Sequence, residues 1–172
     1  MLKGFFQTYK RTQMMIFVTI LFFLGMGVWF IMLYRGCSGW KQFDPYSAIP
    51  AGKEVSFSID SACEYEDGYF RISGWSLVNG EPIETVDQHL LAQDLQTGVF
   101  YLLPTSPTMR YDVALALTGE ETGMGYEHSG LVSVLRKKDL DRPYRLYILN
   151  CNNENNLLID TGAVLDPADY GL

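Results

Sequence analysis

The stretch YFRISGWSL, residues 69–77, decides the fold of this 172-residue chain. Apolar and polar side chains alternate along it, and a period of two is the signature of a β-strand with one buried face. Asp67-Gly68 precedes the stretch and Asn79-Gly80 follows it, and both dipeptides are typical of tight turns. Residues 55–59 alternate in the same way before the first turn. The sequence therefore predicts two strands with a turn between them.

Strand patterns continue through the rest of the chain. Five further stretches are expected to form strands: residues 86–94, 99–103, 129–135, 144–151 and 157–160, the first two as a hairpin. A long connection, residues 104–125, follows the hairpin, and residues 112–117 within it predict either a helical turn or a short strand. About seven short strands with regular turn signals predict a mainly β domain, an Ig-like antiparallel β-sandwich. Closure of the strands into a barrel is the alternative.

Residues 14–34, MMIFVTILFFLGMGVWFIMLY, form a continuous apolar run. A helix of this length spans about 31 Å, close to the thickness of the hydrocarbon core of a bilayer. A helix buried in a soluble core would show a polar stripe, and this run has none. The run is too long for a cleaved signal peptide and no small-residue cleavage site follows it. We therefore expect a single transmembrane helix that is not cleaved.

The charged residues predict the orientation of this helix. The chain has a net charge of −7, yet its first 35 residues carry only the basic residues Lys3, Lys10, Arg11 and Arg35, and the first acidic residue is Asp44. Because positive flanks stay in the cytoplasm, we expect a cytoplasmic N-terminus and an extracytoplasmic C-terminal domain at the cell membrane. The acidic remainder would repel a phosphate backbone, which argues against nucleic acid as a partner.

These observations divide the chain into five parts. Residues 1–13 are expected to form a cytoplasmic tail and residues 14–34 the transmembrane helix, whose partner is the lipid bilayer. Residues 35–53 are rich in Gly, Pro and Ser and predict a stalk. The β-sandwich is expected over residues 54–165, and residues 166–172 are expected to form a C-terminal tail.

Cys63 and Cys151 lie near the ends of two predicted strands. In an oxidising exterior a disulfide between them would close a long loop and stabilise the fold by about 4 kcal/mol. Two free thiols are the alternative. Cys37 would be left over just outside the membrane, as an ordinary stalk residue or as a link between two anchors.

The sequence gives little support for a catalytic site or a metal site. His89 and His128 are the only histidines and lie too far apart for a two-histidine metal motif. No nucleophile motif or phosphate-binding loop occurs, and no spacing supports a pair of carboxylates for glycosidic cleavage. The sequence therefore predicts no enzyme, no metal site and no cofactor.

Three residues are candidates for a ligand or partner contact. Trp75 would stack on a sugar ring if it were exposed, although a Trp on the second strand more commonly fills the centre of a sandwich core. Arg110 and Asp112 are candidates for the same contact. The alternative for this pair is an ion pair that fastens the long connection to the sheet.

The dipeptide Gly74-Trp75, the motif Arg110-x-Asp112-Val113 and the dipeptide Gly125-Tyr126 follow one another in this order, before a Tyr-rich strand. In this order the chain resembles bacterial extracytoplasmic β-sandwich modules with a "GW(A) … RpDV … GF" pattern, which belong to cell-surface and polysaccharide-associated proteins. The resemblance covers residues 54–161, with Tyr111 in place of Pro and Tyr126 in place of Phe. It implies a non-catalytic binding or scaffolding role and does not imply a ligand.

Taken together, the patterns predict a membrane-anchored, non-enzymatic accessory or interaction protein of the bacterial cell envelope, linked to the assembly or export of surface polysaccharide. Its expected partner is an envelope protein or a glycan. A tethered carbohydrate-binding module is the first alternative and a membrane-bound glycan hydrolase the second. Aromatic side chains lining one exposed face would favour a sugar, and an apolar surface patch would favour a protein partner.

Overall fold

A computed structural model describes residues 2–52 and 54–170, and only the backbone of residues 2–13 and 33–38. The chain divides into a helical unit, residues 1–39, and a β unit, residues 40–172. Helix α1 (Leu2–Ser38) contains the segment Met14–Met32, which is long and apolar enough to cross a membrane. Because α1 ends at Ser38, the first residues of the predicted stalk are helical.

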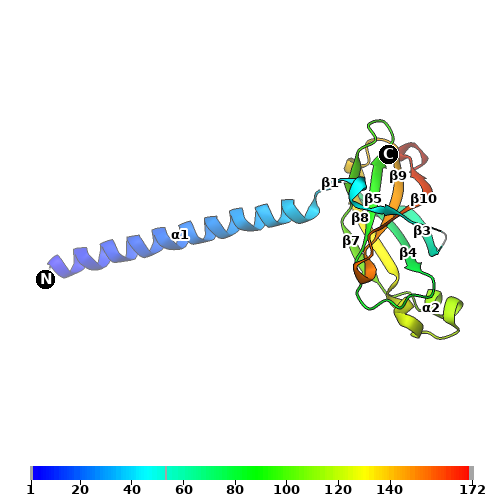
Figure 1. Ribbon diagram of the computed structural model, residues 1–172. Helices are drawn as coiled ribbons and strands as arrows, with labels where there is room; N and C mark the ends of the chain where they lie inside the picture. The colour runs from blue at the N-terminus through cyan, green and yellow to red at the C-terminus, as the bar shows by residue number, and fades with distance from the viewer. Residues whose placement is uncertain (1, 53, 171–172) are drawn as a thin grey trace. The chain divides into compact units, whose positions relative to one another are not determined.

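The β unit consists of two sheets that face each other (Figure 1). The first sheet has the strand order β1 (Lys41–Phe43), β6 (Phe100–Leu102), β5 (Gln88–Asp94), β9 (Tyr144–Asn150), β10 (Leu157–Leu165) and β2 (Ile49–Pro50). The second sheet has the order β3 (Val55–Glu66), β4 (Tyr69–Val78), β8 (Gly130–Arg136) and β7 (Thr105–Thr108). The predicted mainly β fold, a sandwich that follows an apolar helix, is confirmed.

The strand order matches the immunoglobulin arrangement. The order β3-β4-β8-β7 corresponds to strands ABED, and β5-β9-β10 corresponds to CFG. All neighbouring strands are antiparallel except β2 and β10, which are parallel. All seven predicted strands are present. The sequence missed β1, β2 and β7, because two or three residues carry no period and β7 contains Pro107.

Short helices fill the connections. Helix α2 (Tyr111–Thr118) decides between the two predictions for residues 112–117 in favour of a helix, and Gly119 ends it with a φ of 78°. The 3₁₀ helices are η1 (Pro45–Ser47), η2 (Gly123–His128), η3 (Lys137–Asp139), η4 (Asn152–Glu154) and η5 (Pro167–Tyr170). Figure 1 shows α2 at one end of the sandwich.

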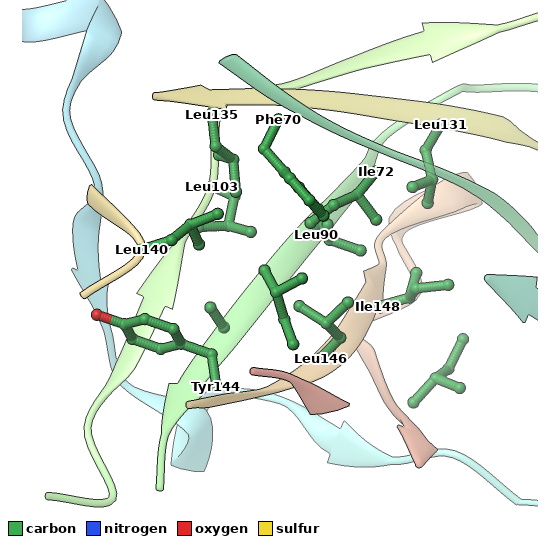
Figure 2. Close-up of a cluster of buried hydrophobic side chains, with 13 residues drawn as sticks. Phe70, Ile72, Leu90, Leu103, Leu131, Leu135, Leu140, Tyr144, Leu146 and Ile148 are labelled. Carbon is green, nitrogen blue, oxygen red and sulfur yellow. The ribbon is translucent and has the colours of Figure 1, made fainter. Parts of the chain in front are cut away.

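The main core lies between the two sheets, where side chains from both point toward one another (Figure 2). Phe70 and Ile72 of β4 meet Leu90 of β5 and Ile148 of β9, and all four are fully buried. The ring of Tyr170 packs edge-on against Phe70, with 4.7 Å between the ring centroids. The predicted C-terminal tail therefore belongs in part to the fold.

Residues 40–50, which we call the strap, correct the prediction of a stalk. The strap begins at the edge beside β6 and ends at the opposite edge beside β10, so it crosses the outer face of the first sheet. Phe43 and Ala48 of the strap pack over a second apolar cluster on this face. The cluster consists of Leu91, Phe100 and Leu149. The ordered domain therefore begins at residue 40, and both edges of the first sheet are covered.

Candidate functional site

Trp75 lies on the outer face of the second sheet, which corrects the prediction that it fills the centre of the core. Because side chains alternate along β4, Trp75 points away from the face that carries Ile72. Its ring is half-buried against a small cluster under α2 and η2. The members of this cluster are Leu77, Val113, Ala114 and Tyr126. Trp75 therefore packs α2 and η2 against the sheet with a partly buried ring.

Arg110 fastens the start of α2 to β3. Its Nε and Nη2 donate to the two carboxylate oxygens of Asp112 at 2.9 and 2.7 Å, and its Nη1 donates to Asp60. Its backbone N–H donates to the carbonyl of Glu127 at 2.7 Å. The predicted ion pair between Arg110 and Asp112 is confirmed, and Asp60 is a partner that the sequence did not reveal.

The electrostatics of this pair exclude a proton-donor role for Asp112. Hydrogen bonds from the Arg110 guanidinium lower the pKa of Asp112 to about 2, although partial burial opposes the shift. The same hydrogen bonds raise the pKa of Arg110 above its ordinary value. Asp112 is therefore ionised at neutral pH and cannot serve as the general acid that a glycosidase needs.

The three motifs that carry the resemblance meet in space around this cluster. Gly125 adopts a φ of 70°, and a Cβ there would lie 2.5 Å from the carbonyl oxygen of Ile83. This close approach seats Tyr126, whose hydroxyl accepts from the N–H of Gly80 and donates to the carbonyl of Val78. The motifs thus hold α2 and η2 against the outer face of the second sheet, and their role here is structural.

Six large apolar side chains are exposed at this end of the sandwich. We call them the α2 surface, and they are Val86, Met109, Tyr111, Leu115, Leu117 and Met124, each between 40% and 51% exposed. Val86 and Met109 also line a pocket of about 180 Å³ together with Pro107, Thr108 and His128. Met124 has a left-handed backbone with a φ of 59°, which is strained for a residue with a side chain.

Acidic residues surround the α2 surface. The exposed residues Glu84, Glu120 and Glu121 lie beside it. Among the described residues, Arg110 lies at this end and is engaged by two carboxylates. Five of the nine basic residues after residue 39 lie between Arg136 and Arg145, at the opposite end of β8 and β9. The sequence could have indicated this surface through the apolar residues of YDVALAL, which exceed what one buried helix face needs.

Cys63 and Cys151 are free, so the predicted disulfide is not formed. Cys151 directly follows β9. The last residue of β9, Asn150, donates a hydrogen bond to Ser76 of β4, and Ser76 pairs with Phe57 of β3. Cys63 lies six residues beyond Phe57, about 20 Å along the strand, whereas a disulfide needs Cα atoms about 4–7 Å apart. The prediction for Cys37 concerns a side chain outside the described residues.

The described residues contain no group of three or more His, Cys, Asp or Glu side chains that could hold a metal ion. His89 lies 2.8 Å from Asp87, and His128 lies 3.7 Å from Glu127, so each histidine contacts a neighbouring carboxylate. Two such isolated pairs do not make a metal centre.

Comparison with protein-family models gives no match, and comparisons with curated proteins and with solved structures give none either. The class of protein is therefore defined by the fold alone. It is an Ig-like β-sandwich joined to one apolar helix that is long enough to span a membrane.

Proposed function

We propose that this chain is a membrane-anchored, non-enzymatic interaction protein of a bacterial cell envelope, and that the α2 surface is where it binds a partner protein. The observation that carries the proposal is the group of apolar side chains left exposed on and around α2. Contiguous apolar surface is costly in water and is typical of protein interfaces. Five of these six side chains are aliphatic or Met, which favours a protein over a sugar.

The partner is expected to have an apolar centre and basic residues around it. Glu84, Glu120 and Glu121 surround the α2 surface, and complementary charges would orient the encounter. The pocket beside Met109 is large enough for one aliphatic side chain of the partner. A second copy of this chain presents the same acidic surround at its own α2 surface and would be repelled there.

The orientation and the location are part of the same proposal. The basic residues before Met14 and the acidic composition after Asp44 support a cytoplasmic N-terminus and an extracytoplasmic sandwich. The resemblance to polysaccharide-associated modules supports a role beside surface polysaccharide assembly or export. With Cys37 and Cys151 replaced by Ser, an impermeant maleimide should label Cys63 on intact cells as fully as in lysed cells. Labelling that requires lysis would contradict the orientation.

Site-specific photocrosslinking tests the partner. A benzoylphenylalanine at Met109 or Leu115 of the full chain, in its native membrane, should give one discrete crosslinked protein. The same probe at Val164, which is equally exposed on β10, is the matched control and should not give it. Leu115→Glu should abolish the crosslink formed from position 109. Equal crosslinking from position 164, or no crosslinking from positions 109 and 115, would contradict the proposal.

A further inference from the structure

The strap and the β5–β6 hairpin flank a second, open hollow on the outer face of the first sheet. Its volume is about 610 Å³, within the range of ligand sites. The strap contributes Gln42, Phe43, Asp44, Pro45 and Tyr46, and the hairpin contributes Gln93, Gly98, Val99 and Phe100. It shares none of these residues with the α2 surface.

Tyr46 is held at this hollow with its ring almost entirely in water, 95% exposed. The turn that carries it is fastened by several hydrogen bonds. Its own N–H donates to Asp44 at 3.0 Å, the N–H of Ala48 donates to Pro45, and Asn156 donates to the carbonyl of Ser47. Folding does not need this ring, since it buries almost nothing. The backbone that carries the ring is therefore held in place, and the exposed ring is open to a ligand.

The hollow also contains polar groups, of which Gln93 is held by a hydrogen bond. The hydroxyl of Tyr147 donates to Oε1 of Gln93 at 3.1 Å, which orients the side-chain amide so that its NH₂ group remains a donor. Asp44 provides carboxylate acceptors and Gln42 an exposed amide. The hollow therefore combines one aromatic face with both donors and acceptors.

We propose that this hollow binds a neutral saccharide, with Tyr46 stacked on the apolar face of one sugar ring and Asp44, Gln42 and Gln93 bonded to its hydroxyls. Sugar rings offer an apolar C–H face and a rim of hydroxyls, which the aromatic ring and the amides match. None of the nine lining residues is basic, and Asp44 is acidic. An anionic sugar or an anionic lipid headgroup would therefore find no cation there.

The test uses the full chain in phosphatidylcholine nanodiscs and calorimetric titration with neutral hexasaccharides of glucose, mannose, galactose and N-acetylglucosamine. At least one of them should bind with a Kd below about 1 mM. Tyr46→Ala should weaken this binding by about tenfold or more, and Tyr46→Phe should retain it within about twofold, because stacking needs the ring and not its hydroxyl. Tyr65→Ala is the matched control, an exposed tyrosine on β3 that should change nothing.

Three results would overturn the proposal. The first is that no neutral hexasaccharide binds. The second is that Tyr46→Ala and Tyr65→Ala bind equally well. The third is that hexagalacturonate, or vesicles containing phosphatidylglycerol, bind the hollow more tightly than any neutral sugar. Because the α2 surface lies elsewhere, each result leaves the proposed protein partner to be judged by its own crosslinks.

Discussion

The hydroxyl of Tyr126 accepts a 2.7 Å hydrogen bond from the backbone N–H of Gly80, 46 residues earlier in the chain. The same hydroxyl donates to the carbonyl of Val78 at 3.3 Å, and the tyrosine itself is only 3% exposed. One buried side chain thus satisfies two backbone groups at the end of β4. This contact joins η2 to the second sheet and keeps α2 in place.

Tyr126→Phe should therefore destabilise the domain by about 1–2 kcal/mol, because it leaves the N–H of Gly80 and the carbonyl of Val78 without their partner. Urea unfolding of the full chain in detergent micelles, followed by tryptophan fluorescence, measures the loss. Tyr46→Phe removes a hydroxyl from a fully exposed ring and should change stability by less than about 0.5 kcal/mol. Equal effects of the two substitutions would contradict this role for Tyr126.

Arg110→Met should raise the pKa of Asp112 from about 2 toward its ordinary value of 3.8, since the donor that stabilises the carboxylate is gone. A carboxyl whose pKa is lowered by folding contributes stability above its unfolded pKa and loses it as the pH falls through its folded pKa. The contribution of Asp112 is therefore present above about pH 4 and is lost toward pH 2. Carbon-13 NMR titration of Asp112 checks the shift.

At neutral pH the same substitution should cost about 1–2 kcal/mol, between the values typical of exposed and buried ion pairs. Arg145→Met is the matched control, because Arg145 pairs with Asp160 at 40% side-chain exposure, whereas Arg110 is 21% exposed. It should cost less than about 1 kcal/mol. If the control is the more damaging of the two, Arg110 does not hold α2 in the way described.

Most strands of the sandwich could be predicted from the two-residue alternation of apolar and polar side chains. The position of Trp75 could not. At this end of β4 the small residues Gly74 and Ser76 face inward, and Trp75 and Leu77 face outward under α2. Ser76 faces inward because it bonds Gln88, which with Asn150 forms a buried polar network. The sequence showed an alternation but not which of its faces was covered.

Cys63 should react with a maleimide at least about tenfold faster than Cys151 at pH 7.5, measured by mass spectrometry in a Cys37→Ser background. Burial, aided by the charge of Asp87, raises the pKa of Cys151, and the thiolate is the reactive form. Cys63 is exposed. A mass lower by two hydrogens in the unreduced protein, or equal rates at the two thiols, would contradict the separation of these residues.

The candidate surfaces were harder to predict than the strands, for a physical reason. Leu115 and Tyr46 look like ordinary members of an apolar helix and of a Pro-rich linker, and only their exposure in the folded chain distinguishes them. The strap was missed for a different reason. Its two strands are too short to show a period, and its anchor Phe43 is a single aromatic residue in a Gly-, Pro- and Ser-rich segment.

We expect the strap to keep the β unit monomeric. A chain that begins at Gly39 should give a monomeric, cooperatively folding domain, whereas a chain that begins at Glu54 should aggregate. Loss of the strap uncovers Leu91, Phe100 and Leu149 and frees the backbone of β6 and β10 to pair with other chains. Size-exclusion chromatography with light scattering distinguishes the two outcomes.

A point substitution tests whether the packing of Phe43, and not only the presence of the strap, stabilises the domain. Phe43→Asp places a charge over the apolar cluster and should destabilise the longer chain by about 2–4 kcal/mol. Gln42→Asp introduces the same charge at the neighbouring exposed position of β1 and should be nearly neutral. If the chain from Glu54 is as stable and monomeric as the chain from Gly39, the first 15 residues after α1 are a stalk after all, and the cluster beneath them needs no cover.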